Sequence, residues 1–444
     1  NLALRIFRAD CRGTADFCTK RYHSVCLVKT DTTRPGMSNT KSIRKTTRSA
    51  EPRRSFAKVA ALAIALANFA SGQQDAQAGP REEAKRMYDR LTGTPPSPDL
   101  LDTLTNEVNS RGLEETAMYI MDRDAPHSRY FYSVTLKNFA TPWTNRDQTV
   151  FAALNDYTAT VIGFVRDERD FRDILSDDVL YVGSGVTPAY SATSNAHYEA
   201  LENSNADLRE VLQPAAQSSL LGIPSHATAG IITSRAASEA FFVAGTNRAM
   251  FRFTMLNHLC RDLEQLHDTR LPPDRIRQDV TRSPGGDSSV FLNSCVGCHN
   301  GMDPLAQAFA YYDFDETQGR LIYTEGQVQP KYLINADNFK PGFVTPDDSW
   351  ENRYRLPGPN RLLGWSPSLP GKGNGAKSLG QELAHSDAFA QCQVEKVFRA
   401  MCFRSPSDES DRQRVADSTR DFKVDGNLKR VFAQTAAYCA KPTP

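Results

Sequence analysis

The chain has 444 residues, with 53 Lys and Arg against 52 Asp and Glu, and 40% of its residues are hydrophobic. This is the composition of a soluble globular protein long enough for two or three domains, and it excludes the collagen-like, disordered and disulfide-dense miniprotein classes. The charge is unevenly spread: residues 1–78 hold 14 basic and 5 acidic residues, so the remainder carries a formal charge of −8. A nucleic-acid binder needs a concentrated basic face, and this balance indicates no nucleic-acid partner.

The first segment has the pattern of an export signal. Several Lys and Arg residues follow Met37, an apolar run occupies 59–70, and Ala-Gln-Ala stands at 76–78. A basic region, a short apolar region and an A-x-A site are typical of a secretory signal peptide. The sequence therefore predicts a signal peptide over 37–78 and a periplasmic or otherwise exported product.

Two further points concern export. Residues 1–36 lack an initiator Met and precede Met37, so we interpret them as over-extended translation. The segment 53–58, Arg-Arg-Ser-Phe-Ala-Lys, resembles a twin-arginine signal, which leaves both this route and the general secretory route open. No later stretch approaches the roughly 18 apolar residues of a membrane span, so no transmembrane segment is expected in the mature chain.

The pattern over 79–183 is helical and predicts an N-terminal helical domain. Ser97 is a candidate helix N-cap, because Pro98 and Asp99 follow it and apolar residues then recur at helical spacing. A second apolar stripe runs over 151–165. We interpret both stripes as core packing.

Residues 184–340 form the next predicted domain. Its first part is rich in Ser, Thr, Asn and Ala and is expected to consist of loops with short elements, followed by a helix over 247–266. The Pro- and Gly-containing stretch 268–290 predicts a loop that leads into the motif at 295–299.

The last part of the chain begins with an irregular connection over 341–378, which is dense in Pro, Gly and Asn. A C-terminal helical domain is predicted over 379–444. Its apolar spacing indicates one helix over 379–403 and another over 408–438, with a break near Gly426. No sustained alternating strand pattern occurs, so the fold class is predicted to be mainly α.

The motif Cys295-Val-Gly-Cys298-His299 carries the chemistry of the chain. C-x-x-C-H allows two thiols to bond the two vinyl groups of one haem and places the imidazole under the iron. Covalent attachment requires export, which the signal peptide supplies independently. A structural zinc site requires a second Cys/His pair at a suitable spacing, and the sequence has none. A thioredoxin-like redox pair requires a βαβ context, which is also absent. We therefore predict one covalently attached haem c per chain, with His299 as the proximal iron ligand.

The sixth iron ligand decides the class of function. Met302 lies three residues after His299, on the same side of the chain, and cannot easily reach the opposite haem face. The candidates from farther along the chain are Met401, His385, Met255 and His258. For a Met or His at helical spacing, core packing is the competing interpretation. A five-coordinate iron is the further alternative.

The four other cysteines after the signal peptide are even in number, and an exported protein meets an oxidising compartment. They are Cys260, Cys392, Cys402 and Cys439. Cys392 and Cys402 would lie about 15 Å apart along one helix and should not pair together. We expect Cys402 or Cys392 to bridge to Cys439, with free buried thiols as the alternative.

Beyond the bare motif, the chain resembles the planctomycete-type family of exported proteins of unknown function. The haem motif of that family runs on into M-D-P-x-x-x-A-x-x-x-x-D, which matches this chain through Asp313. Looser matches lie at 229–233, 383–404 and 90–96. The resemblance implies a cytochrome-c-like haem domain embedded between helical domains with long irregular loops, and haem binding with electron transfer.

Three functions follow from these patterns. The first is an exported c-type cytochrome in periplasmic electron transfer, with a periplasmic redox partner protein. The second is a haem enzyme, peroxidase- or oxygenase-like, with an open distal site. The third is a partner-binding module with a structural or sensory haem. The chain is larger than one haem requires, but size alone is poor evidence for catalysis, so we rank electron transfer as the first of the three functions.

Overall fold

The computed structural model describes residues 79–243, 245–333 and 339–441. These described residues belong to one compact unit. The predicted signal peptide over 37–78 and the segment 1–36 lie outside the described residues.

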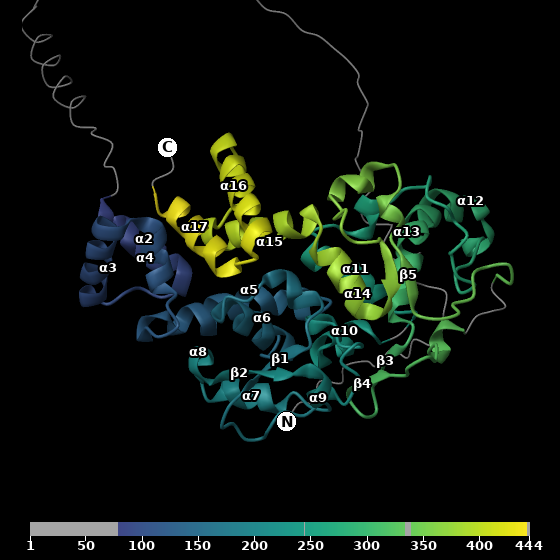
Figure 1. The fold of residues 1–444 in the computed structure, drawn as a ribbon, viewed down its shortest axis with the longest axis horizontal. Coiled ribbons are helices and arrows are strands. Elements are labelled where there is room, and N and C mark those ends of the chain that lie inside the picture. The colour runs from purple at the N-terminus through teal and green to yellow at the C-terminus, as the bar shows by residue number, and fades with distance from the viewer. Residues whose placement is uncertain (1–78, 244, 334–338, 442–444) are drawn as a thin grey trace, which may run out of the picture. The chain divides into compact units, whose positions relative to one another are not determined.

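The described fold is mainly helical, which confirms the predicted class (Figure 1). Its first helices are α2 Pro80–Thr92, α3 Pro98–Arg111, α4 Leu113–Ile120, α5 Lys137–Ala140 and α6 Asp156–Arg166. The middle of the chain holds α7 Ala196–Asn203, α8 Leu208–Val211, α9 Gln217–Leu221, α10 Arg235–Phe241, α11 Arg248–His258, α12 Ser288–Val290 and α13 Val296–Ala306. The last helices are α14 Gly375–Ala384, α15 Asp387–Cys402, α16 Glu409–Asp425 and α17 Leu428–Ala440.

Among the described residues, three small antiparallel sheets of two strands each interrupt the helices, although the sequence shows no sustained strand pattern. They pair β1 Val179–Gly183 with β2 Leu212–Ala216, β3 Tyr312–Asp315 with β4 Arg320–Tyr323, and β5 Ser349–Glu351 with β6 Lys372–Asn374. Each strand has three to five residues, too few for an alternating pattern to stand out in the sequence.

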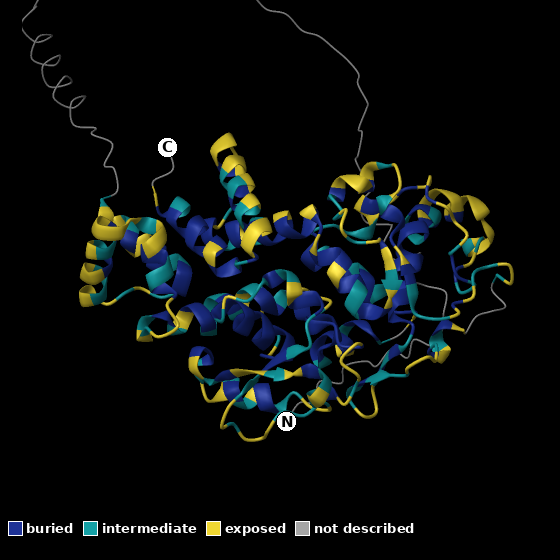
Figure 2. Cartoon of the chain, viewed as in Figure 1, coloured by how far each residue is buried: buried dark blue, intermediate teal, exposed yellow. Residues whose placement is uncertain are grey.

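The N-terminal helices begin where their capping residues predict. The Ser97 side chain accepts a hydrogen bond from the backbone of Leu100, at the start of α3. The stripe over 151–165 becomes α6, which starts only after the Asn155 cap. Every residue of α6 is buried, and Figure 2 shows this helix almost wholly in the colour of buried residues. A helix buried on all sides lies at the centre of a core.

Two expected helices are shorter than predicted. The helix over 379–403 is divided into α14 and α15, because Ser386 leaves the helical conformation and caps the next helix by accepting from the backbone of Phe389. The helix over 247–266 ends as α11 at His258, and only a single 3₁₀ turn, Leu263–Leu266, follows it. The break near Gly426 is confirmed: Gly426 ends α16 in the left-handed conformation.

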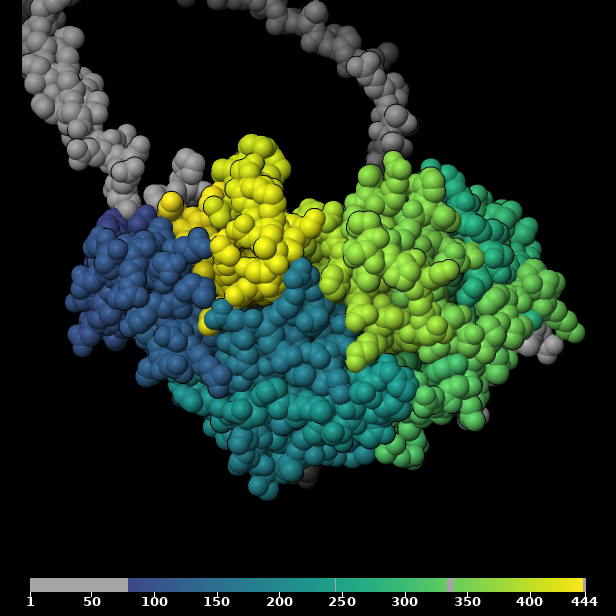
Figure 3. Space-filling view, in the orientation of Figure 1, coloured from purple at the N-terminus to yellow at the C-terminus, as the bar shows by residue number. Residues whose placement is uncertain are grey.

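One main hydrophobic core connects the start, middle and end of the described chain. Helix α17 packs against α4, α2 and α15, so the last described helix lies beside the first described ones (Figures 1 and 3). A second, separate cluster is small and consists of Ile276, Val280, Phe291 and Cys295. It contains the first cysteine of the motif.

In the part of the chain that the structure describes, two disulfides join helices of this core. Cys402 bridges to Cys439, as expected, and ties the end of α15 to α17. Cys260 bridges to Cys392 and ties the end of α11 to the middle of α15. Cys392 and Cys402 are not paired with each other, which confirms the argument from their spacing. Within the described ranges, no helix combines the length and the apolar character needed to cross a membrane.

Candidate functional site

The motif lies on one nearly continuous helical segment. Asp287 caps it by accepting from the backbone of Ser289, a wide helical turn covers Phe291–Cys295, and α13 continues from there to Ala306. Residues four apart share a face of a helix. Phe291, Cys295 and His299 therefore line one face.

A cavity of ≈ 320 Å³ opens beside this face. Phe291 lies in its wall, and Ile276 joins the wall to the small cluster that buries Cys295. The rest of the lining comes from two loops and comprises Pro273, Asp274, Arg282, Phe339, Pro341, Gly342 and Phe343. A concave, mostly apolar cavity of this volume falls in the range of small-molecule and cofactor sites.

Arg282 brings a positive charge into the cavity wall. Its guanidinium lies over the rings of Phe291 and Phe339, at 5.0 and 4.1 Å from the ring centroids. It also donates to the backbone carbonyls of Ile276 and Val280. These contacts hold the charge between two aromatic side chains that belong to distant segments.

The opposite face of α13 is packed closely against two rings. A Cβ atom on Gly297 would lie 2.5 Å from the ring of His267, and one on Gly301 would lie 2.2 Å from the ring of Tyr354. Both glycines are therefore required by close approach. Cys298 lies at the edge of this face, where its Sγ is 3.4 Å from the backbone carbonyl oxygen of Leu263. This packing fixes one side of the helix, while Cys295 packs in the small cluster with Phe291 and Ile276, two residues of the cavity wall.

The imidazole of His299 is held by a buried carboxylate. Its Nδ1 lies 3.1 Å from Oδ1 of Asp303, one turn farther along the helix, and an ionised carboxylate can only accept. Nδ1 therefore carries the proton. The side chain of Asp303 is fully buried and that of His299 is 14% exposed. The second ring nitrogen, Nε2, is on the side of the ring away from Asp303.

Asp303 belongs to a buried group of charges. Arg248, at the start of α11, donates from Nε to Asp303 Oδ1 over 2.8 Å and also forms two hydrogen bonds with Asp279. Burial alone would raise the pKa of Asp303, but the charges of Arg248 and His299 outweigh it and hold the pKa well below the usual value. The carboxylate is therefore ionised and oriented.

Two of the four distal candidates are core methionines. Met401 is fully buried in the main cluster, beside the disulfide of Cys402. Met255 is fully buried on α11 in the same cluster. Neither lines the cavity beside Cys295.

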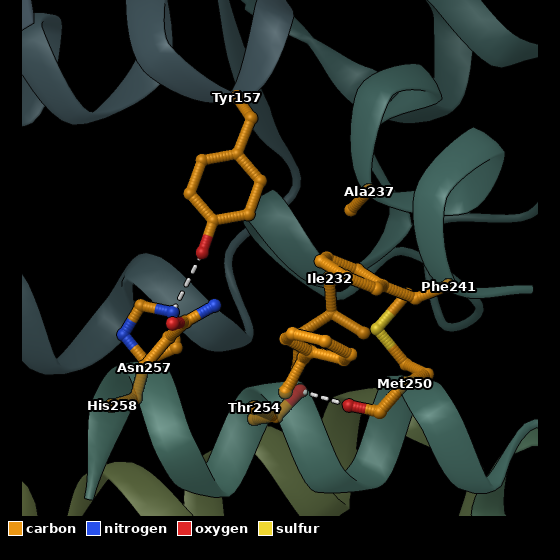
Figure 4. Close-up of a pocket in the computed structure, with 9 residues that line it drawn as sticks. Tyr157, Ile232, Ala237, Phe241, Met250, Thr254, Asn257 and His258 are labelled. Atoms are coloured by element: carbon orange, nitrogen blue, oxygen red, sulfur yellow. Dashed lines mark hydrogen bonds between the residues drawn. The ribbon is translucent and has the colours of Figure 1, made fainter. Parts of the chain in front are cut away.

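The two histidines also lie away from the cavity lining. His258 is buried, and its Nε2 lies 2.7 Å from the hydroxyl of Tyr157, toward which its ring is directed in Figure 4. Burial, and secondarily the charge of Lys396, lowers the pKa of His258 well below its usual value. His385 is exposed at the end of α14. Cys295, Cys298 and His299 thus lie on one helical segment, and neither these three residues nor the four distal candidates line the cavity themselves.

Sequence reasoning missed three residues of the site. Asp303 stands in the sequence only as part of the M-D-P motif, although its spacing of four from His299 on a helix could have indicated the contact. Arg248 and Arg282 reach the site through tertiary packing, and no sequence signal marked them. Among the described residues, no group of three or more His, Cys, Asp and Glu side chains is arranged to hold a metal ion.

Comparison with models of known families, with curated proteins and with solved structures finds no match to this chain. The site is therefore interpreted from its own residues.

Proposed function

We propose that this protein is an exported c-type cytochrome that carries one covalently attached haem and acts in periplasmic electron transfer. The observation that carries the proposal is the arrangement of Cys295, Cys298 and His299 on one helical segment, with Cys295 packed in a cluster that contains two wall residues of a largely apolar cavity. Cys295 and Cys298 would form the two thioether bonds, and Nε2 of His299 would bind the iron.

The surrounding residues fit such a group. Histidine ligands of metals almost always donate their other ring N–H to a carboxylate, a carbonyl or water, and Asp303 is such a partner for Nδ1. The apolar lining suits a flat hydrophobic ring, and Arg282 supplies a charge opposite to that of haem carboxylates. When bound, the haem would supply a one-electron redox centre. The resemblance to the planctomycete-type family is part of the same proposal.

A second function is favoured by one specific observation. The described lining of the cavity contains no Met and no His, so it offers no sulfur or imidazole as a distal ligand. This favours a haem enzyme with an open distal site, such as a peroxidase- or oxygenase-like protein. No comparable observation favours a partner-binding module.

The test is to express the chain with a haem-attachment system and to record oxidised, reduced and reduced-plus-CO spectra. The expected result is covalent haem that survives denaturation and is lost in C295S/C298S, whereas the neighbouring exposed-site control S294A retains it. Absence of covalent haem from the wild-type chain would overturn the proposal.

The CO spectrum distinguishes the two functions. A ferrous spectrum that CO leaves unchanged indicates a saturated iron and electron transfer. Rapid CO binding indicates an open distal site, and peroxide and oxygen then become the compounds to assay for turnover.

A further inference from the structure

The carboxylate of Asp303 receives hydrogen bonds from three residues. His299 donates from Nδ1, Arg248 donates from Nε over 2.8 Å and from Nη2 over 3.2 Å, and the backbone N–H of Arg277 donates over 3.3 Å. The Asp303 side chain is fully buried, so its carboxylate does not contact solvent. The carboxylate therefore stays in contact with the imidazole.

The position of Arg248 explains why the charge is stable there. Its side chain lies between Asp303 and Asp279, with bonds of 2.6 and 2.8 Å to the second carboxylate. One guanidinium thus contacts two carboxylates. Arg248, Asp303 and Asp279 together carry a net charge of −1, to which the positive charge of Arg277 is added. Arg277 also donates from its side chain to the backbone carbonyl of Asp303 over 3.0 Å, which fixes this turn of α13.

A carboxylate acts on a ligand histidine differently from a neutral carbonyl. Both acceptors fix the ring orientation and the tautomer, but a carboxylate also draws the Nδ1 proton toward itself and raises the basicity of Nε2. A more basic Nε2 donates more electron density and favours the oxidised metal, and hydrogen bonding of this kind is one of the means by which a protein sets a haem potential.

We propose that Asp303 is a positioning residue of this site, which orients His299 and lowers the reduction potential of the haem that His299 binds. The inference rests on the proposed function, because it requires the haem. It adds to the proposed function the residue that shifts the reduction potential, Asp303, and the direction of that shift, which is downward.

The experiment uses the full chain with attached haem and compares the wild type with D303N, D303E and the control D279N. Asn keeps the shape and an accepting oxygen but removes the charge. D279N neutralises the second carboxylate that Arg248 contacts, and it leaves the hydrogen bond between Asp303 and His299 in place. The measurements are the midpoint potential by redox titration and the hyperfine-shifted ring resonances of His299 by NMR of the ferric protein.

The expected result is a higher potential and moved His299 resonances in D303N, with partial return toward the wild type in D303E. D279N is expected to leave the resonances in place and to shift the potential less. The inference is overturned if D303N matches the wild type, or if D279N moves both measurements as far as D303N does.

A further variant covers the case in which D303N does not fold. In R248Q the guanidinium that shares the Asp303 carboxylate is gone while the His299 contact stays, so the potential is expected to fall; an unchanged or higher potential overturns the inference. The two proposals fail in different ways. A wild-type chain without covalent haem overturns both, whereas attached haem with the same potential in every variant overturns only the role of Asp303.

Discussion

The ring of Tyr354 lies so close to the backbone of α13 that a Cβ atom on Gly301 would stand 2.2 Å from its Cε1 atom. Tyr354 is fully buried and comes from a 3₁₀ turn more than fifty residues later in the chain, Arg353–Arg355. The contact therefore joins the helix of the C-x-x-C-H motif to the irregular connection over 341–378.

This contact predicts that Gly301→Ala destabilises the protein. The added methyl group has no free space, and overpacking of a closely packed interior costs about 1–3 kcal/mol. The measurement is the free energy of unfolding in urea. In a Tyr354→Leu background the same substitution should cost much less, because the ring that causes the clash is gone. Equal costs in the two backgrounds would contradict the packing argument.

The local elements of this fold could be predicted because their signals are local. Ser97 and Gly426 have the side chain or the backbone freedom that helix ends require, and the structure places helix ends at both. Ser386 carries the same capping signal, but the apolar spacing continued past it and concealed the division between α14 and α15.

The site could be predicted only as far as it lies within one helix. Cys295, Cys298 and His299 are adjacent in sequence, so their spacing sufficed. The cavity wall around residues 339–343 and the approach of Arg248 to Asp303 depend on how distant segments pack, and no local pattern encodes this packing. Asp303 could be predicted in part, because the sequence shows its spacing of four from His299 but does not show that its side chain is buried.

The core positions of two methionines predict the spectra of their variants. Met401→Leu and Met255→Leu conserve volume in the main cluster and should cost less than about 1.5 kcal/mol of stability. Neither side chain lines the cavity beside Cys295, so if haem is attached as proposed, the oxidised and reduced absorption spectra are expected to be the same in the wild type and in both variants. Loss of a sulfur–iron band in either variant would identify that methionine as the distal ligand.

The buried His258 predicts a dependence of stability on pH. Its pKa in the folded protein is well below the usual 6.5, so as the pH falls through 6.5 the unfolded chain takes up a proton that the folded chain does not. Stability therefore falls with pH from that point, by up to about 1.4 kcal/mol per unit until the folded pKa is reached. Above 6.5 this contribution is constant.

The measurement is urea unfolding between pH 5 and pH 8 for the wild type and His258→Gln. The variant is expected to lose this part of the slope, while the exposed-site control His385→Gln keeps it. A wild-type slope that persists unchanged in His258→Gln would show that other groups cause the pH dependence.

The disulfides predict an order of stabilities. A crosslink restricts the unfolded chain more when it closes a longer loop, and Cys260–Cys392 spans 132 residues against 37 for Cys402–Cys439. Cys402→Ser/Cys439→Ser is expected to lower the free energy of unfolding by about 2–4 kcal/mol, and Cys260→Ser/Cys392→Ser by somewhat more. Urea unfolding with and without a reductant measures both effects. Under reducing conditions all three proteins should unfold at similar urea concentrations. A difference that survives reduction would mean that the Ser substitutions act through packing rather than through the crosslinks.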